Sequence, residues 1–428
     1  MPTPSTQPLD EATRRLRALR DPALPALPVV LGAEAQELLD AAIPPPDSAG
    51  PAVLRRVGWR PGRSLNALFA RPTEVAAAGG SAHHEELMVA SVDRGTGGGD
   101  GTEIFIRGAF DDPDLPGLRS TMSGADLDDW LDAMGVPAGL SERRLIAYRP
   151  GRRAVVEVRR GEQRLFVKIV RPGATGQMRG RHEEFGRIAP VPRILGTADA
   201  AGIVVMQALD GETAWGALLR GRTVDPAAIH ELLARIHELP VPERVVASPI
   251  ERVDAHVREL SMLLPEEAPR LAALAEAIGP EGQPATTTIH GDLHGGQFLV
   301  AGGAVVGLLD LDVVGMGRPA DDPANALAHI AALIPTSEGG APVIAPWLEP
   351  MVRFANDFLA LSDTIHDPVD LRRRIAAALL GLAAAQFQSV APDWPGAIRQ
   401  RLAAAESWLE SSRTADLGVF MSASSSAA

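Results

Sequence analysis

The sequence predicts an α+β protein of more than one domain, on three observations. First, a chain of 428 residues exceeds what one ordinary hydrophobic core supports, so two or three domains are expected. Second, short strand-like segments separated by glycine turns dominate the chain as far as Gln207. Third, apolar residues recur at helical spacing from Asp225 onward. We therefore expect antiparallel sheets in the first half and helices in the second.

Composition narrows the class of protein. Apolar residues make up 46% and charged residues 22%, which is typical of a soluble globular protein. The longest apolar run, Ile375 to Ala385, is far too short to span a bilayer, so we expect a cytoplasmic protein without a membrane partner. The chain has no cysteine, which excludes disulfides, thiolate zinc sites and a cysteine nucleophile.

The net charge of −13 argues against a nucleic-acid partner, because no basic block interleaved with aromatic residues offsets it. This charge would attract cationic substrates, although ordinary solubility charge explains it equally well. The oligomeric state is not indicated by any pattern in the sequence.

The first part of the chain predicts two short helices and four strands. Asp10 to Arg20 is amphipathic, and Met122 to Met134 is a second helical pattern with Ser123 as a possible cap. Glycines between Gly95 and Gly101 indicate a flexible tip. The expected strands are Ala52 to Trp59, Ser64 to Ala70, Glu85 to Val92 and Glu103 to Arg107.

A short internal similarity links this part of the chain to the next. The segment from Arg56 to Ser64 contains Arg-Pro-Gly-Arg, and Leu145 to Arg153 repeats it 89 residues later, each time between two strand-like segments. The first copy could be a non-catalytic relative of the second, or the two could be independent turns that share four residues.

Three further strands, Arg144 to Tyr148, Ala154 to Val158 and Arg164 to Val170, begin the second part of the chain. The turn between the first two could meet phosphate groups through backbone N–H groups and through Arg152 or Arg153. Lys168 lies inside an apolar strand, where a charge needs a partner or a functional reason. A solvent-facing lysine on an edge strand is the alternative.

Acidic residues concentrate between Thr286 and Asp312. The loop His290-Gly291-Asp292-Leu293-His294 precedes Gln297 and a predicted hairpin, whose second strand runs from Val305 to Leu311. Strand alternation would place Asp310 and Asp312 on one face. Carboxylates that converge in this way can hold a divalent cation and accept a proton. In phosphoryl transfer the corresponding roles are a base, Asp292, and metal ligands, Gln297 and Asp310.

This stretch resembles the aminoglycoside phosphotransferase and choline-kinase-like family of small-molecule kinases. The resemblance rests on His290-Gly291-Asp292-x-His294, on Leu309-Asp310-Leu311-Asp312, and on Asp321-Asp322 after Gly317. Gln297, where most members have Asn, is similar to the maltokinase and glucosamine-kinase branch. Arg318 stands where the family has an aspartate, which we expect to weaken one structural contact.

The resemblance implies a bilobal protein-kinase-like fold with an added N-terminal domain. The expected units are a cap at 1–140, a sheet-containing N-lobe at 141–208, a helical C-lobe at 209–415 and a disordered tail at 416–428. Expected helices of the C-lobe lie near Pro226 to His237, Asp322 to Leu333, Ile344 to Leu361, Pro368 to Gln388 and Trp394 to Ser412.

The resemblance also implies ATP and Mg²⁺ as cofactors and assigns roles to individual residues. Lys168 would hold the α- and β-phosphates and pair with Glu184, or with the neighbouring Glu183. Gln207 and Leu209, with Ala208 between them, would form the hinge beside adenine. Asp312 would complete the metal site or bind substrate, and Asp322 would cap a helix or anchor the loop.

His290 and His294 have two interpretations. The favoured one is structural, with His290 hydrogen-bonded to loop backbone. The alternative is metal ligation, which two imidazoles among carboxylates would direct to zinc and which lacks a third nearby histidine in the sequence.

The leading functional hypothesis is an ATP-dependent kinase for a hydroxyl of a sugar or amino sugar. An antibiotic phosphotransferase acting on an aminoglycoside or similar compound is the close alternative. A nucleotide-binding protein with little catalysis and a metal-dependent hydrolase built on His290, Asp292 and His294 are the hypotheses from other classes.

Overall fold

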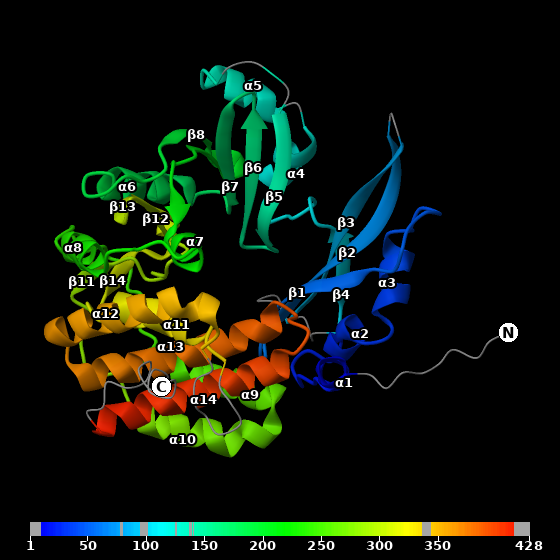
Figure 1. The fold of residues 1–428 in the computed structure, drawn as a ribbon. Coiled ribbons are helices and arrows are strands. Elements are labelled where there is room, and N and C mark those ends of the chain that lie inside the picture. The colour runs from blue at the N-terminus through cyan, green and yellow to red at the C-terminus, as the bar shows by residue number, and fades with distance from the viewer. Residues whose placement is uncertain are drawn as a thin grey trace.

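The chain folds into two antiparallel sheets and a large helical half (Figure 1). This computed structural model describes residues 10–77, 80–94, 102–124, 126–136, 139, 141–335 and 344–414. The expected flexible tip at Gly95 to Gly101 and the expected tail at 416–428 both lie entirely outside these residues. The α+β class predicted from the sequence is confirmed.

The first sheet has four antiparallel strands in sequence order, of which the second and third are longer than predicted. Asp10 caps the helix before it by accepting a 2.7 Å hydrogen bond from the Thr13 amide. Trp59 packs edge-on against Phe387 of the helical half, at 6.0 Å between ring centroids, so this sheet shares a core with the helices. Its elements are α1 (Glu11–Ala18), α2 (Leu27–Leu31), α3 (Ala35–Ala42), β1 (Val53–Arg60), β2 (Ser64–Ala77), β3 (Gly80–Asp93) and β4 (Ile104–Gly108).

The second sheet has five antiparallel strands in the order β5-β6-β7-β9-β8. The three strands predicted here are confirmed as β5, β6 and β7, and α6 crosses between β7 and β8. Lys168 lies inside β7, with the buried Val167 and Ile169 on either side of it in the sequence. The elements are β5 (Ser141–Arg149), β6 (Arg153–Arg160), β7 (Gln163–Val170), α6 (Thr175–Phe185), β8 (Ile194–Ala198), η1 (Asp199–Ala201) and β9 (Ile203–Gln207).

The two sheets begin with equivalent hairpins. Arg60 pairs with Ser64 in the first and Arg149 pairs with Arg153 in the second, at the same offset of 89 residues. The turn glycines, Gly62 and Gly151, both have positive φ, at 74° and 67°, which glycine adopts without strain. The weak similarity seen in the sequence therefore corresponds to a repeated structure.

In each copy, one aspartate side chain holds the turn by accepting hydrogen bonds from it. Asp21 accepts hydrogen bonds from the Gly62 amide at 2.8 Å and from the Trp59 indole at 3.1 Å. Asp112 accepts them from the Gly151 amide and the Tyr148 hydroxyl, both at 2.7 Å.

Each aspartate opens an Asp-Pro-x-Leu-Pro-x-Leu segment, at 21–27 and at 112–118, which leads into a pair of short helices. We infer that the chain contains two copies of one unit, and that the second copy has gained α6 and β8.

This repeat moves the expected domain boundary. The single helix predicted at Met122 to Met134 is wrong, because α4 (Gly117–Ser123) ends at Gly124 and α5 (Asp126–Ala133) follows it. Leu118, Leu127 and Leu131 of these helices join the core of the second sheet. We therefore propose a boundary near residue 108 in place of residue 140.

The helical half contains the predicted helices and two small antiparallel sheets, of three and two strands, that carry the acidic stretch. Among the described helices, none is long and apolar enough to cross a membrane. The elements are β10 (Glu212–Thr213), α7 (Ala214–Leu219), α8 (Pro226–His237), η2 (Ile250–Arg252), α9 (Val253–Leu263), η3 (Pro265–Glu267), α10 (Ala268–Ile278), β11 (Thr287–Ile289), β12 (Phe298–Ala301), β13 (Ala304–Leu308), η4 (Leu311–Val313), β14 (Gly315–Gly317), α11 (Asp321–Ala331), η5 (Pro346–Leu348), α12 (Glu349–Ile365), α13 (Pro368–Gln388) and α14 (Trp394–Thr414).

Arg318 does not weaken a contact, contrary to expectation. It is buried and forms a bidentate ion pair with Glu251, at 2.8 and 3.0 Å. Beside it the fully buried Arg374 binds Glu281 at 2.8 Å and Asp321 at 2.7 Å. This network fixes the start of α11, the helix that carries Asp322, Asn325 and His329.

Candidate active site

The acidic loop is held by buried backbone contacts. The amides of His290 and Gly291 donate to the two carboxylate oxygens of Asp322, at 2.7 and 2.8 Å. The His290 ring lies with Nε2 2.9 Å from the carbonyl of Leu309, so it ties the loop to the end of the next hairpin. Asp322 is thus a loop anchor, and the contacts of His290 support its structural role; neither side chain is available as a reactant.

One face of α11 docks along this loop. Residues 322, 325 and 329 share a face because they are three and four positions apart. Asn325 donates to the Leu293 carbonyl at 3.0 Å, and the His329 ring stacks on the His294 ring at 4.4 Å between centroids. His329 was not among the predicted site residues, although its helical spacing from Asp322 was a usable signal.

Asp310 and Asp312 converge by a different route from the predicted one. β13 ends at Leu308, and Asp310 has a left-handed backbone with φ of 55°, which is uncommon for a residue other than glycine. The 3₁₀ turn η4 then brings Asp312 round. The strand predicted as far as Leu311 is therefore wrong at its end, but the two carboxylates still face one site. Local strain of this kind concentrates at functional sites.

Two cations reach these carboxylates from the second sheet. Lys168 Nζ lies 2.9 Å from Asp310 Oδ1 and 2.5 Å from Asp312 Oδ1. Arg153 lies 3.2 Å from Asp310 and 2.5 Å from Asp312. Burial raises the pKa of Asp310, but the charges of Lys168 and Arg153 outweigh it and hold that pKa well below its usual range.

The predicted pairing of Lys168 with Glu184 is absent from the ion pairs of these described residues. The face of α6 turned inward carries Met178, His182 and Phe185, which are buried. Glu183 is exposed and Glu184 only half-buried, because both lie off that face. His182 instead sits near Lys168, and burial together with that positive charge lowers its pKa.

Only one of the two arginines that were predicted to meet phosphate groups, Arg153, contacts the acidic residues of the site. Arg152 lines the cleft but does not reach the carboxylates, whereas Arg153 does. Arg153 is the first residue of β6, whereas Arg152 lies in the turn before it.

Two of the three predicted hinge residues already use their backbone amides in hydrogen bonds of the sheet. The amide of Gln207 donates to the Arg193 carbonyl at 2.9 Å, and that of Ala208 donates to the Arg164 carbonyl at 3.2 Å. The Gln207 side chain is exposed and accepts from Arg193 at 3.1 Å. Leu209, half-buried at the junction of the two lobes, is left as our proposed hinge contact.

Gln297 lies beside His294. Its side-chain amide is 3.2 Å from His294 Nε2, while the Gly296 amide donates to His294 Nδ1 at 3.0 Å. Since Nδ1 accepts, the neutral ring carries its proton on Nε2, the nitrogen that lies beside the Gln297 side-chain nitrogen. Gln297 therefore contacts an imidazole, and its role as a metal ligand stays a prediction.

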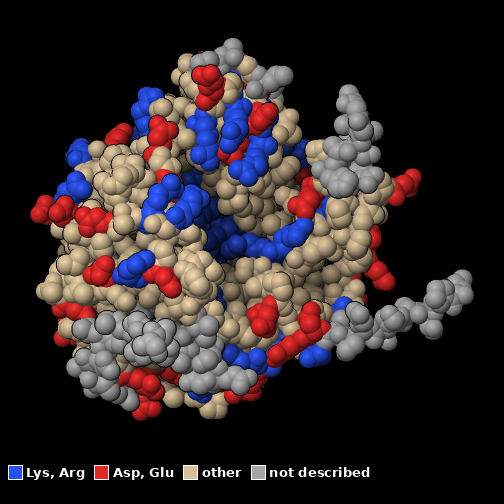
Figure 2. Space-filling model, viewed as in Figure 1, with Lys and Arg blue, Asp and Glu red and all other residues tan. Residues whose placement is uncertain are grey.

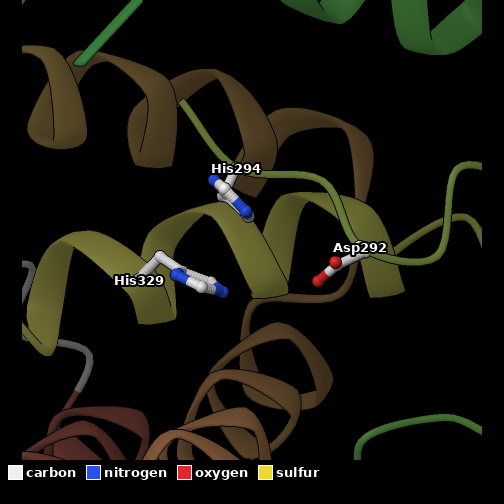
Figure 3. Close-up of side chains that lie close together, drawn as sticks. All are labelled: Asp292, His294 and His329. Atoms are coloured by element: carbon white, nitrogen blue, oxygen red, sulfur yellow. The ribbon is translucent and has the colours of Figure 1, made fainter. Parts of the chain in front are cut away.

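Asp292 faces two imidazoles, those of His294 and His329 (Figure 3). One ligand atom from each of the three residues lies within 4.8 Å of the others, so the third histidine that the sequence seemed to lack is present. Burial lowers the pKa of His294 to about 4 and that of His329 to about 3, so both are neutral near pH 7.

The His294 ring stacks on Trp215 at 4.9 Å between centroids, and Trp215 also contacts the His329 ring at 5.7 Å, so the three rings form one cluster. The two imidazoles meet face to face, whereas a shared metal is bound by ring edges. Burial also raises the pKa of Asp292, and Asp310 adds to that rise. A carboxylate with a raised pKa beside neutral imidazoles suits a proton acceptor.

A cavity of about 660 Å³ opens beside Asp292 and Asp312. The hollow between the lobes is lined with lysine and arginine (Figure 2). Seven arginines line this cavity: Arg149, Arg152, Arg153, Arg171, Arg181, Arg244 and Arg252. The site is therefore cationic although the chain as a whole is acidic.

Comparison with known proteins gives one family match. Residues 145–348 match the phosphotransferase enzyme family. No curated protein sequence matches the chain.

Solved structures with a similar backbone are distant in sequence. An aminoglycoside phosphotransferase, APH(4)-Ia, is 12% identical and matches 66% of this chain and 97% of its own, with a TM-score of 0.46. A macrolide 2'-phosphotransferase from Brachybacterium faecium is 16% identical over 66% and 97%, with a TM-score of 0.37. A choline/ethanolamine kinase family protein from Mesorhizobium loti is 17% identical over 69% and 98%, with a TM-score of 0.43. Because each TM-score is below 0.5, the functional assignment rests on the family match and the site geometry.

Proposed function

Because residues 145–348 match the phosphotransferase enzyme family, we propose that this protein transfers the γ-phosphoryl group of ATP to a hydroxyl group of a sugar. The observation that carries the proposal is the meeting of Lys168 from one lobe with Asp310 and Asp312 from the other, beside Asp292. Phosphoryl transfer needs this combination, because positioning and charge neutralisation supply most of its rate acceleration.

Asp310 and Asp312 suit Mg²⁺. Both present carboxylate oxygens, the hard ligands that Mg²⁺ prefers, and the low pKa of Asp310 keeps it ionised. They would hold the ion, which would neutralise charge on the β- and γ-phosphates when bound. Lys168 and Arg153 would then turn from the carboxylates to phosphate oxygens.

The transfer step follows from these positions. The bond between the γ-phosphorus and the bridging oxygen of ADP breaks as the acceptor oxygen bonds to that phosphorus. Asp292 orients the acceptor hydroxyl and accepts its proton. His294 and His329 lie on the loop side of the site as neutral imidazoles. They therefore add no positive charge that would compete with Lys168 and Mg²⁺ for the phosphates of the nucleotide.

The cavity distinguishes among the acceptors considered. Amino sugars and aminoglycosides carry positive charge near pH 7 and would be repelled by the seven arginines. A sugar without an amino group is therefore favoured over the amino-sugar and antibiotic alternatives. The retention of Lys168, Asp292 and Asp310 in one site argues against a nucleotide-binding protein without catalysis.

The test is ATP consumption with Mg²⁺ across sugars, amino sugars, aminoglycosides, macrolides and choline. We expect one acceptor class to stimulate turnover, and both Asp292→Ala and chelation of the metal to abolish it. ATP binding without stimulated turnover by any acceptor would contradict the proposal, as would metal-dependent hydrolysis that needs no ATP.

A further inference from the structure

The cavity beside Asp292 contains more positive charge than its acidic partners neutralise. Of its seven arginines, Arg153 pairs with Asp310 and Asp312, and Arg171 pairs with Asp114 at 3.2 Å. The ion pairs between described residues include none from Arg149, Arg152, Arg181, Arg244 or Arg252. Arg181 and Arg244 bind the Asp312 carbonyl, each at 2.7 Å, which fixes their heads at the cavity wall.

These arginines lie at the end of the cleft away from the proposed hinge. The cavity lining includes Gly291, Asp292 and Asp312 but none of Gln207, Ala208 or Leu209. A nucleotide that extends from the hinge would present its γ-phosphate to Lys168 and Arg153 first. The space beyond, beside Asp292, is where the acceptor must lie, and its wall is formed by Arg181, Arg244 and Arg252.

The first copy of the repeated unit adds to this charge. Arg56, on β1, is half-buried, and burial together with the positive charges of Arg149, Arg153 and Arg152 lowers its pKa. Arg60 acts in the same sense on Arg152. The two equivalent hairpins therefore bring their arginines together, although like charges repel.

Repulsion among these arginines destabilises the fold. The chain has a net charge of −13, yet its many acidic side chains do not neutralise this cluster. The favourable counterpart is an anion, since a guanidinium binds phosphate and carboxylate through two parallel hydrogen bonds.

We propose that the acceptor itself is anionic: a sugar or similar polyol that carries a phosphate or carboxylate group, bound by Arg181, Arg244 and Arg252 while its hydroxyl faces Asp292. This inference rests on the proposed function and specifies its substrate class.

The test uses the full chain saturated with Mg²⁺ and the non-hydrolysable ATP analogue AMP-PNP. Binding of glucose, glucuronate, glucose 6-phosphate and glucosamine is measured by titration calorimetry, and turnover with ATP is measured for the same four compounds. Arg252→Gln is the variant, because Arg252 is exposed and forms no ion pair among the described residues. Arg258→Gln is the matched control, because Arg258 is an exposed arginine on the adjacent α9 that does not line the cavity.

We expect an anionic compound to bind beside AMP-PNP, and glucose and glucosamine to bind at least tenfold more weakly. Arg252→Gln should weaken the anion about tenfold, the loss of one charge-assisted hydrogen bond, and leave AMP-PNP affinity unchanged. Arg258→Gln should change neither. A difference between glucuronate and glucose 6-phosphate identifies which anionic group the site takes.

Three results would overturn the inference. One is preferred binding or turnover of glucose or glucosamine. Another is an anion that binds only in the absence of AMP-PNP, which would make the arginines part of the nucleotide site. The third is equal binding of all four compounds in wild type and Arg252→Gln. Loss of AMP-PNP binding itself would instead contradict the proposed function, so the two failures are distinguishable.

Discussion

The two copies of the repeated unit share a hairpin and differ in chemistry. Lys168 on β7 pairs with Val155 on β6, and the equivalent register in the first copy pairs Ser91 with Asn66. Ser91 donates to the Asn66 side chain at 2.8 Å, so that position ends in a local polar contact. Lys168 instead reaches across the cleft to Asp310 and Asp312. The same backbone hairpin thus carries a local polar contact in one copy and, in the other, the lysine of the proposed phosphate-binding lobe.

The largest difference between the copies should appear when these two residues are replaced. Lys168→Met should lower kcat/KM by about 10²- to 10³-fold, because it removes a fixed positive charge from the transferring phosphates. Ser91→Ala should change kcat/KM less than about twofold, since it removes one half-buried neutral hydrogen bond. Steady-state kinetics with the best acceptor measures both, and equal losses would show that the copies do not differ as described.

The aspartates that hold the two turns should differ in stability. Asp112→Ala should lower the free energy of unfolding by about 3 kcal/mol, because it leaves Arg107, 3.0 Å away, and the Tyr148 hydroxyl without a buried partner. Asp21→Ala should cost about 2 kcal/mol, since only neutral donors lose their acceptor. Urea unfolding tests the order, and the reverse order would contradict the assigned contacts.

The turn glycines provide a smaller contrast. Gly62→Ala and Gly151→Ala should each cost about 1 kcal/mol of stability, because both have positive φ. A Cβ at Gly151 would also lie 3.0 Å from the Asp114 carboxylate, whereas one at Gly62 would meet no atom within 4 Å. Gly151 lies in the turn that is proposed to meet the phosphate groups, so only Gly151→Ala should also raise the KM for ATP. An equal rise for Gly62→Ala would argue against a phosphate-binding role that belongs to the second turn alone.

The smallest effect concerns pH. Asp292 must be ionised to accept a proton, so kcat/KM should fall as the pH drops through its raised pKa. Arg149 lowers that pKa, so Arg149→Gln should raise it further and move the acidic limb to higher pH by less than about one unit. The equivalent Arg60→Gln should leave the limb in place. A limb that moves to lower pH in Arg149→Gln would contradict the sign.

Much of this structure could be predicted from the sequence because local patterns determine it. Alternation and glycine turns located the strands of both sheets, and Asp225, followed by Pro226, located the start of α8. The loop motif placed Asp292, Asp310 and Asp312 at one site. Each of these depends on residues close together in the chain.

The features that were missed depend on distant packing. The inward face of α6 carries His182 where Glu184 was expected, and helix docking alone decides which residue faces Lys168. His329 lies on α11 and comes close to Asp292, which is in a loop that precedes this helix in the chain. The cationic cavity draws arginines from five separate segments, so the net charge of the chain gave no indication of its sign.

The most direct test of the central claim follows the γ-phosphate of ATP by ³¹P NMR with the best acceptor. Wild type should convert it into a phosphomonoester of the acceptor, and Asp292→Asn should form that product at least about 10²-fold more slowly. Release of inorganic phosphate alone, or an undiminished rate in Asp292→Asn, would contradict the assignment of this site as a kinase active site.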